Sequence, residues 1–390
     1  MLYKDFSEKL LGLQDAEIKN IETDKEKIVI TIRMKRKPHI CPCCGKETTH
    51  IHDYRKQVIK DVPSFGKQII LILEKRRYVC ACSKRFYEEV PFLPRYHRMT
   101  NRLIAFVIEK LRNTTSFTQV SKDVNLSVST VIRIFDFISF SKPKLPEVIA
   151  IDEFKGNTGG EKYNCIITDP ANHKVLDILP TRNTRYLSTY FKAFKDRGNV
   201  KMFISDMWNS YADIASVYFK SAKQVVDKYH WIRQIIWAFE RVRKDIQKKF
   251  QKDYRVYFKH SRKLLLKRYD FLEEVQKQQV MVMLSVSPTL YSAHFLKEEF
   301  LKILDCENRT EAKKMMLEWL DEASECGIEP FEKCAMTIFN WFTGILNSFD
   351  TPYTNGFTEG CNNKIKVLKR NAYGYRNFKR FRKRILFMFT

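Results

Sequence analysis

The chain has 390 residues, with 70 Lys and Arg against 45 Asp and Glu, so its formal net charge is +25. Hydrophobic residues make up 44% and aromatic residues 13% of it, which excludes disorder as the main state, and the sequence has no run of about 18 apolar residues that would predict a membrane-spanning helix. An excess of positive charge this large gives information about binding partners and not about the fold. It favours a polyanionic partner such as nucleic acid.

The sequence predicts several regions in chain order. The first residues lack the apolar segment of a secretory signal, so we expect the protein to stay in the cytosol. Residues 1–95 alternate like β-strands around two cysteine clusters, and residues 96–142 read as short helices. A proline-containing linker follows, and residues 147–232 then alternate between strands and helices. Residues 233–350 are helical throughout, and residues 351–390 predict basic helices that complete the third region.

The cysteine clusters in the first region predict a metal site. Cys41 and Cys44 form a knuckle followed by Gly45, and Cys80 and Cys82 come from the end of a strand further along the chain. Four thiolates suit a closed tetrahedral Zn²⁺ site, which stabilises a small β module with a thin core. Since the second pair is one residue tighter than usual, other residues could replace a ligand, namely Cys43, His39, His50 or His52. The alternative is that these cysteines are buried or redox-inactive thiols that bind no metal.

The second region contains a candidate helix-turn-helix. Residues 117–124 and 127–136 predict two helices around a tight turn, with Ser127 or Ser129 capping the second. In such a motif the start of the second helix faces the major groove of DNA. The residues that we expect to contact DNA there are Ser129, Thr130 and Arg133. The alternative is a plain helical hairpin.

Two aspartates stand directly after apolar strands of the third region. Asp152 follows the strand 147–151, and Asp206 follows the strand 200–205. Carboxylates at the ends of neighbouring strands repel each other unless cations lie between them. Their hard oxygen atoms suit Mg²⁺, and two such ions can activate a nucleophile and stabilise a leaving oxygen in phosphodiester chemistry.

Glu359 is the best candidate for a third carboxylate. It follows the turn at Asn355-Gly356, in a segment that predicts a helix. Helical spacing puts Glu359 on one polar face together with Asn363, Lys366 and Arg370. This face offers a metal ligand followed by groups that bind phosphates. Glu153 alternates to the opposite side of its strand from Asp152, so we expect at most a secondary role for it.

Two basic stretches are candidates for holding the DNA backbone. Residues 241–268 contain twelve Lys and Arg against two Asp, and residues 364–384 contain ten more with no acid. Basic stretches of this kind neutralise phosphates, although each by itself could be a solvated helix face. The candidate contacts in the two stretches are Arg241, Lys244, Lys379 and Arg382. His230 could contact a phosphate or a base, or be a packed histidine.

The order of the motifs along the chain matches that of a known family. The zinc knuckle comes first, then the helix-turn-helix, and then four motifs with acidic residues. The motifs are Ala150–Phe154, Ser205–Met207, Asp227–His230 and Thr354–Asn362. The chain resembles bacterial insertion-sequence transposases of the ISL3 family, which are DDE enzymes. The resemblance implies a multidomain α/β fold: a ribonuclease-H-like mixed sheet with an all-helical insertion, preceded by a zinc-binding β module and a helix-turn-helix.

The resemblance also implies the chemistry and the partners. Mg²⁺ or Mn²⁺ would be bound by Asp152, Asp206 and Glu359, and structural Zn²⁺ by Cys41, Cys44, Cys80 and Cys82. The enzyme would bind double-stranded DNA at the terminal inverted repeats, cleave there, and join the 3′-hydroxyls to target DNA. We expect at least a homodimer on DNA, no membrane partner, and a place in the bacterial cytoplasm at the nucleoid. The alternatives are a DNA-binding regulator with an inactive nuclease-like domain, and a ribonuclease-H-like host nuclease.

Overall fold

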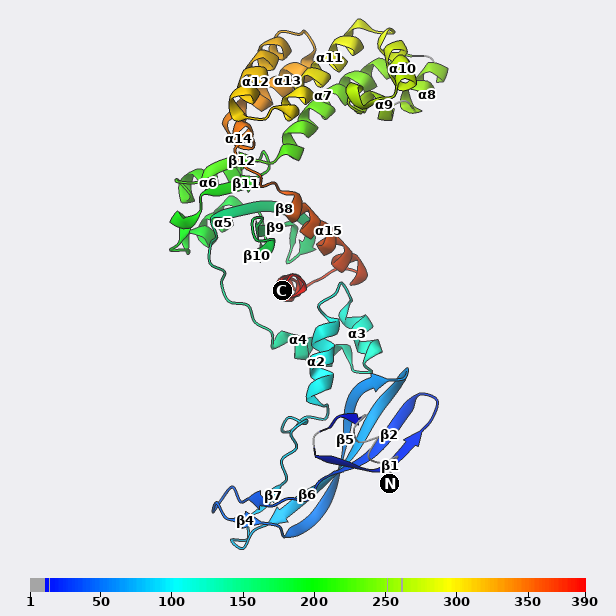
Figure 1. Ribbon diagram of the computed structural model, residues 1–390, viewed down its shortest axis with the longest axis vertical. Coiled ribbons are helices and arrows are strands. Elements are labelled where there is room, and N and C mark those ends of the chain that lie inside the picture. Colours follow the sequence, from blue (N-terminus) through cyan, green and yellow to red (C-terminus); the bar gives the residue numbers. More distant parts are fainter. Residues whose placement is uncertain (1–10, 14, 251, 261) are drawn as a thin grey trace. The chain divides into compact units, whose positions relative to one another are not determined.

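The computed structural model describes residues 11–13, 15–250, 252–260 and 262–390 (Figure 1). The chain divides into two compact units. One unit is built from Met1–Phe140 together with Ile365–Thr390, and the other is Ser141–Lys364. Among the described residues, no helix combines the length and the apolar character that crossing a membrane requires.

The first unit begins with a twisted β-sheet. Its strands are β1 (Ala16–Thr23), β2 (Lys27–Met34), β5 (Ile51–Ser64), β6 (Lys67–Val79) and β7 (Arg85–Tyr87). The long hairpin of β5 and β6 turns at Phe65 and Gly66, which both have positive φ, as a two-residue hairpin loop requires. A small ladder of β3 (His39–Ile40) and β4 (Glu47–Thr48) carries the first cysteines. The predicted strand character of this region is therefore confirmed.

Three short helices follow in the first unit: α2 (Asn101–Lys110), α3 (Phe117–Asp123) and α4 (Val128–Asp136). The Ser127 hydroxyl caps α4 by accepting a hydrogen bond from the Thr130 N–H at 3.2 Å. Val120, Val131 and Phe135 are buried between the helices. The helix-turn-helix predicted from the sequence forms with its expected cap.

The last helix, α16 (Phe378–Met388), completes the hydrophobic core of the three helices. Phe387 belongs to this core. The side chain of Arg384 is fully buried, and its guanidinium donates to the backbone carbonyls of Leu111, Asn113 (2.9 Å) and Thr115 (2.8 Å). Because α2 ends at Lys110, Arg384 satisfies carbonyl groups at the helix end that would otherwise lack partners.

We predict that Arg384→Ala destabilises the helix-turn-helix by about 3 kcal/mol or more, because one buried and two partly buried carbonyls lose a charged donor. Hydrogen exchange of the amides in α2, α3 and α4 measures this loss directly. The matched control is Lys379→Ala, which removes an exposed cation from the same helix. Equal protection in the two variants would show that Arg384 does not hold this domain together.

The second unit contains a five-stranded mixed sheet in the order β10-β9-β8-β11-β12. Its strands are β8 (Val148–Thr158), β9 (Glu161–Asp169), β10 (Lys174–Leu179), β11 (Met202–Ser205) and β12 (Lys223–Val226). The first three pair antiparallel, while β11 runs parallel to both β8 and β12. This is the ribonuclease-H-like mixed sheet that the sequence led us to expect.

Helices lie on both faces of this sheet (Figure 1). One face packs against α5 (Thr184–Lys192) and α6 (Asn209–Tyr218) through a cluster that includes Ile149, Ile151 and Phe203. The opposite face carries Val148, Ala150 and Ile204, and the start of α15 (Gly356–Asn371) is joined to that side by a hydrogen bond between the hydroxyls of Thr168 and Thr358 (2.8 Å). The sheet therefore has one face for its core and one for the acidic residues.

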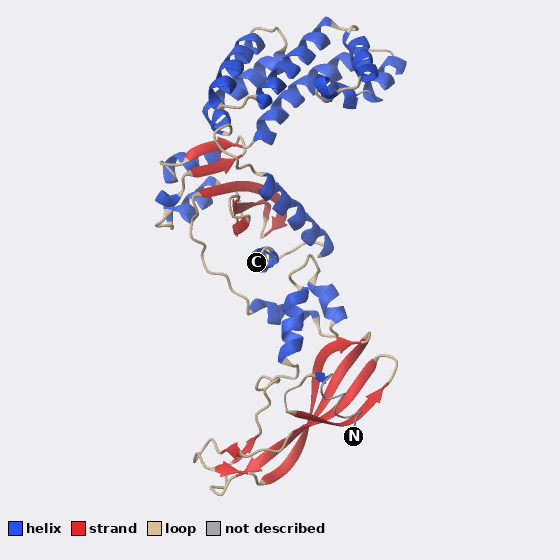
Figure 2. Ribbon diagram, in the orientation of Figure 1, coloured by secondary structure: helices blue, strands red, loops and turns tan. Residues whose placement is uncertain are grey.

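Between β12 and α15 the described chain is helical, as predicted (Figure 2). The helices are α7 (Lys228–Lys248), α8 (Lys252–His260), α9 (Arg262–Leu266), α10 (Glu274–Leu284), α11 (Pro288–Lys302), α12 (Arg309–Ser324), α13 (Glu329–Asn340) and α14 (Phe342–Asn347). They have a large core of their own, which includes Trp231, Phe300 and Phe331.

The sequence placed residues 351–390 with the catalytic region, whereas the compact units separate them at residue 365. The physical reason is the docking of α16 on the helix-turn-helix through Arg384 and Phe387. Helix α15 therefore starts in one unit and ends in the other. The domain boundaries that we inferred from the sequence stay a prediction.

Candidate functional site

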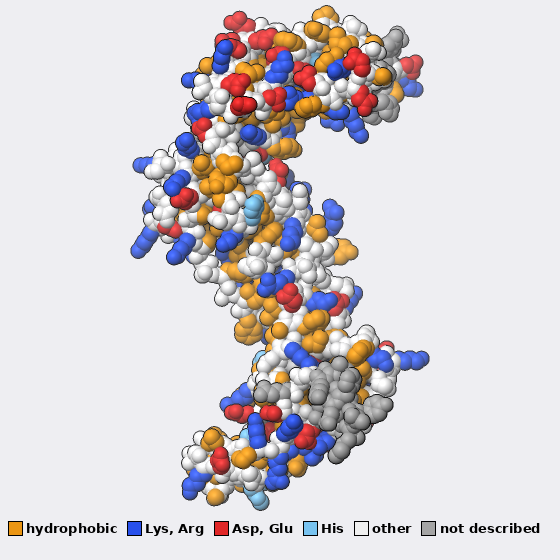
Figure 3. Space-filling model, viewed as in Figure 1, with side chains coloured by type: hydrophobic (Ala, Val, Ile, Leu, Met, Phe, Trp, Pro, Cys, Tyr) orange, Lys and Arg blue, Asp and Glu red, His pale blue; other side chains and the backbone are white. Residues whose placement is uncertain are grey.

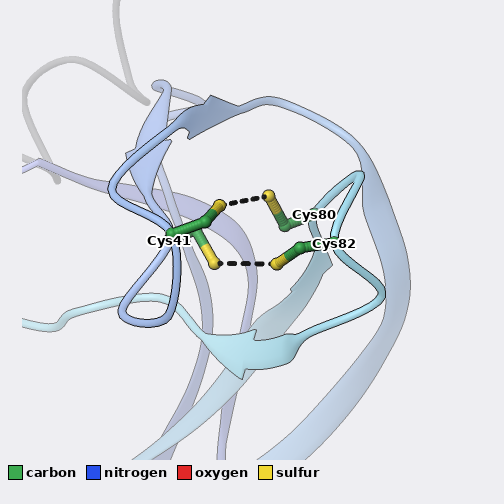
Figure 4. Close-up of side chains that lie close together, drawn as sticks. Cys41, Cys80 and Cys82 are labelled. Atoms are coloured by element: carbon green, nitrogen blue, oxygen red, sulfur yellow. Dashed lines mark hydrogen bonds between the residues drawn. The ribbon is translucent and has the colours of Figure 1, made fainter.

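The four clustered cysteines come together in the first unit. Cys41 Sγ lies 3.7 Å from Cys82 Sγ, and Cys44 Sγ lies 3.5 Å from Cys80 Sγ (Figure 4). All four sulfur atoms lie within 4.8 Å of one another. In a tetrahedral site with Zn–S bonds of about 2.3 Å, the sulfur atoms stand about 3.8 Å apart. The thiols therefore fit one structural Zn²⁺ ion.

The backbone around the knuckle favours a thiolate. Burial alone would raise the pKa of Cys41, but hydrogen bonds from the backbone N–H groups of Cys44 and Cys43 lower that pKa to about 6. Gly45 has a φ of +68°, which lets the chain turn at the end of the knuckle. The tight Cys80-Ala-Cys82 pair reaches the cluster, so no histidine is needed to complete it.

We predict one zinc ion per chain, lost in a Cys44→Ser variant together with the folded structure of residues 37–82. Cys43→Ser is the matched control, because the Cys43 thiol is exposed and does not belong to the cluster. Metal analysis of the purified proteins measures the zinc content. Full zinc content in Cys44→Ser, or its loss in Cys43→Ser, would contradict this ligand set.

Asp152 and Asp206 lie side by side on the second sheet. Strands β8 and β11 are parallel, and Ala150 is paired with Ile204. Continuing this register by two residues places Asp152 opposite Asp206, with both side chains on the same face. That face is opposite the one covered by α5 and α6. The prediction of a strand-end position was right for Asp206, which directly follows β11, but wrong for Asp152, which lies inside β8 because that strand continues to Thr158. The parallel pairing of the two strands, rather than a shared strand end, brings the two carboxylates together.

The surroundings of this pair disfavour negative charge. Burial raises the pKa of Asp152 to about 7, and the charges of Glu153, Asp206 and Glu359 add to the effect. Burial also raises the pKa of Asp206 to about 7, with a further contribution from Glu153. Raised carboxylate pKa values of this size are common at functional sites. A bound cation there would offset the repulsion between the two carboxylates.

Helix α15 is tied to Asp152 by an asparagine. The Asn362 side-chain amide donates to Asp152 Oδ2 at 2.8 Å, and the Glu153 backbone N–H donates to Asp152 Oδ1, also at 2.8 Å. Asn362 is buried and lies one helical turn after Glu359. The charge of Glu359 acts on Asp152, which agrees with this placement.

The Glu359 carboxylate also has two other neighbours. Its ligand oxygen, a carboxylate oxygen of Asp227 and a ring nitrogen of His230 all lie within 4.8 Å of one another. In the described part of the chain, Asp152, Asp206 and Glu359 do not form a cluster that tight. The proposed DNA contact of His230 stays a prediction, and the structure places this half-buried residue beside Glu359.

Asp227 joins the starts of two helices. One of its carboxylate oxygens accepts from the Tyr229 N–H (3.2 Å) and caps α7, and the other accepts from the Asn355 N–H (2.9 Å) just before α15. Both Asp227 and Asn355 are buried. Asp227 therefore fixes the backbone one turn before Glu359.

Glu153 turns away from the aspartates, as its place in the strand predicts. Its carboxylate forms an ion pair with Arg182 (2.6 Å) and accepts a hydrogen bond from the Tyr211 hydroxyl (3.3 Å). Tyr211 is fully buried against the other face of the sheet. This arrangement gives Glu153 a structural role and keeps a cation near the site.

The predicted DNA contacts of the helix-turn-helix lie on α4. Ser129 and Arg133 are exposed, and Thr130 is half-buried. Hydroxyl oxygens of Ser129 and Thr130 lie 3.0 Å and 2.8 Å from Ser127 Oγ, so they also support the cap. Their role in binding DNA stays a prediction.

The remaining predicted contacts lie on three other helices. Arg241 and Lys244 are exposed on α7, and three exposed residues of α15 are Asn363, Lys366 and Arg370. On α16, Lys379 is exposed and Arg382 is half-buried. Among the charged side chains on the visible face around α5 and α6, Lys and Arg predominate, whereas both signs of charge are mixed over the helical segment (Figure 3). The role of these residues in binding DNA stays a prediction.

Sequence reasoning did not assign a role to Asn362 or Asn355. Both lie in the segment Thr354–Asn362 that carries Glu359, and Asn362 is three residues after the acid on the same helix. That spacing could have indicated that Asn362 lies beside Glu359, since residues three apart are neighbours on a helix.

Three family models match the chain, each in a different segment. Residues 37–82 match the zinc-finger of transposase IS204/IS1001/IS1096/IS1165, and residues 88–139 match the helix-turn-helix domain of transposase family ISL3. Residues 149–385 match the ISL3 DDE model described as transposase. The first two matches cover the cysteine cluster and the three short helices.

Curated relatives agree with these matches. The chain is 26% identical over 394 aligned residues to the transposase for insertion sequence element IS1001 of Bordetella parapertussis, covering 97% of this chain and 96% of that protein. It is 29% identical over 119 residues to the transposase for insertion sequence element IS1557 of Mycobacterium tuberculosis, covering 30% and 27%. A match of 58 residues, 43% identical, is to an ATP-dependent protease of Lactococcus lactis subsp. lactis and covers only 15% and 19%.

Proposed function

Since the chain belongs to the ISL3 family of transposases, we propose that it binds the terminal inverted repeats of an insertion sequence, cleaves phosphodiester bonds at its ends, and joins the freed 3′-hydroxyls to target DNA. The proposed site is of the DDE type, with Asp152, Asp206 and Glu359 as ligands of two Mg²⁺ or Mn²⁺ ions. The observation that carries this proposal is the position of the two aspartates on adjacent parallel strands, with α15 held to Asp152 through Asn362.

The donor set supports divalent cations at this site. All three side chains are carboxylates, whose hard oxygen atoms Mg²⁺ and Mn²⁺ prefer. Asp206 Oδ1 is buried and has no hydrogen-bond partner among the described residues, so it is an acceptor available to a cation. Bound there, the ions would activate the attacking oxygen and stabilise the leaving oxygen in both in-line displacements.

The neighbouring residues orient these ligands. The Asn362 amide and the Glu153 N–H each donate to one oxygen of Asp152, which fixes the plane of the carboxylate. Each oxygen keeps a second lone pair for a cation. Asp227 accepts a hydrogen bond from the Asn355 N–H and so holds the turn before α15. This contact fixes the start of the helix that carries Glu359. Such supporting contacts commonly change metal affinity or activity by about 10–100-fold.

The proposed partners follow from the same chemistry. A helix-turn-helix domain binds DNA, and we propose that Ser129, Thr130 and Arg133 contact bases or phosphates in the major groove. Two transposon ends must be processed together, so we propose at least a homodimer on DNA. With DNA as its substrate, the protein would act at the bacterial nucleoid.

A reaction with a labelled duplex that carries one end of the insertion sequence, plus plasmid target DNA and Mg²⁺, tests the function. The expected result is cleavage at the end followed by joined products. Binding without cleavage would favour a regulator, and cleavage without joining or end preference would favour a ribonuclease-H-like nuclease. Either of these results would overturn the proposed function.

A further inference from the structure

A basic cavity lies between α7, α8 and α9, within the helical segment of the second unit. Its volume is about 760 Å³, and it is lined by ten residues, of which six are Lys or Arg and one is Glu. It is formed by residues between Glu240 and Arg262. Charges of both signs are mixed on the visible surface of this segment (Figure 3), whereas cations predominate among the residues that line the cavity.

Hydrogen bonds hold the walls of this cavity in place. Glu240 is buried, and its two oxygens accept from Arg243 Nε (2.6 Å) and Arg262 Nε (2.7 Å), which joins α7 to α9. Arg243 also donates to the Gln247 side chain (2.9 Å), which in turn donates to the backbone carbonyl of Arg255 on α8 (2.7 Å). The single acid is thus neutralised by two guanidinium groups inside the wall.

Three other cations remain available to a ligand. The side chains of Lys244, Lys252 and Arg255 are exposed and make no hydrogen bond or ion pair with the residues that the structure describes. A fourth, Lys248, interacts with the exposed Asp245 at 2.9 Å. Because Lys244 and Lys248 are one helical turn apart, their charges line one wall at a separation of about 6 Å along the helix axis.

We propose that this cavity binds the phosphodiester backbone of double-stranded DNA, at a distance in sequence from the helix-turn-helix. Unneutralised Lys and Arg side chains in an open, polar cavity suit phosphates, which such side chains contact without reading sequence. Phe250, the one aromatic residue in the lining, packs against the core of the helical segment, so the cavity offers no exposed platform for a base. The proposal rests on the proposed function for its partner and adds a second contact region for the same DNA.

The test is the salt dependence of binding to a mixed-sequence duplex that lacks any insertion-sequence end. The full chain and a Lys244→Gln/Arg255→Gln variant are titrated by fluorescence anisotropy between about 50 and 200 mM salt. Loss of two phosphate contacts is expected to make the slope of log K against log salt shallower by about 1.8 and to weaken binding by about 10-fold or more at the lower salt.

The matched control is Lys313→Gln/Lys314→Gln, which removes two exposed cations from α12 in the same helical segment. An unchanged slope in this control, with equal melting temperatures for all three proteins, supports the proposal. Unchanged binding in the cavity variant, or an equal loss in both variants, overturns it. The measurement uses no cleavage, so a protein that binds through the cavity but never cuts DNA would contradict the proposed function alone.

Discussion

Replacing Asp152 by Asn is expected to lower end cleavage and strand transfer by on the order of 10³-fold or more, while binding to end DNA stays within about twofold. The amide can still accept the hydrogen bond from the Glu153 N–H, but it has no negative charge to hold a cation. The DNA-binding helices belong to the other compact unit, so their fold does not depend on this side chain.

Single-turnover cleavage and anisotropy with the same end duplex separate the two effects. Asp213→Asn is the matched control, because it changes the same chemical group at an exposed position on α6. An Asp152→Asn protein that cuts within about tenfold of the parent would exclude Asp152 as a metal ligand.

In buffers without divalent cations, stability is expected to fall as the pH rises from about 4 to about 7. The pKa of Asp152 is raised from 3.8 to about 7 in the folded protein, chiefly by burial. Within this range the carboxyl is ionised in the unfolded chain and protonated in the folded one, so unfolding releases a proton and rising pH favours it. The full effect is about 4 kcal/mol for a shift of this size, and it is complete above pH 7.

Mg²⁺ is expected to restore stability at about pH 8 and to have little effect at about pH 5, because it binds the ionised carboxylates. Denaturant unfolding of the parent and of Asp152→Asn at both pH values measures the difference, since other titrating groups are common to the two proteins. A variant with the same pH slope and the same response to Mg²⁺ as the parent would contradict a charged pair at this site.

Much of the fold could be predicted because the local patterns are strong. Alternating apolar residues marked β2 and β6, and the serine before α4 marked the helix that it caps. The apolar runs before Asp152 and Asp206 were enough to pair the two residues, because parallel neighbouring strands bring equivalent positions side by side, although β8 continues to Thr158 and Asp152 is not at its end. These features depend on residues close together in the chain.

The parts that could not be predicted depend on which surfaces meet. An amphipathic pattern in α16 shows that one face is buried but not what covers it, and Arg384 appeared as one more cation of a basic stretch. Its partners at Leu111, Asn113 and Thr115 are more than 260 residues away in the chain. Asn362 is a similar case, since its hydrogen bond to Asp152 spans 210 residues.

The position of Glu359 was the least predictable feature of the candidate site. Helical spacing put it on a polar face, and the structure agrees that Asn363, Lys366 and Arg370 are exposed beyond it. Spacing could not show that Asp227 and His230 lie next to its carboxylate. The first turns of α15 therefore place Glu359 beside Asp227 and His230, and Asn362 on Asp152.

The most direct test of the proposed site is anomalous diffraction from crystals of the protein with Mn²⁺ and end DNA. The proposed site predicts two manganese peaks about 4 Å apart, which Asp152, Asp206 and Glu359 would hold. Density that leaves the Glu359 carboxylate with Asp227 and His230, and shows no manganese between the aspartates, would contradict it.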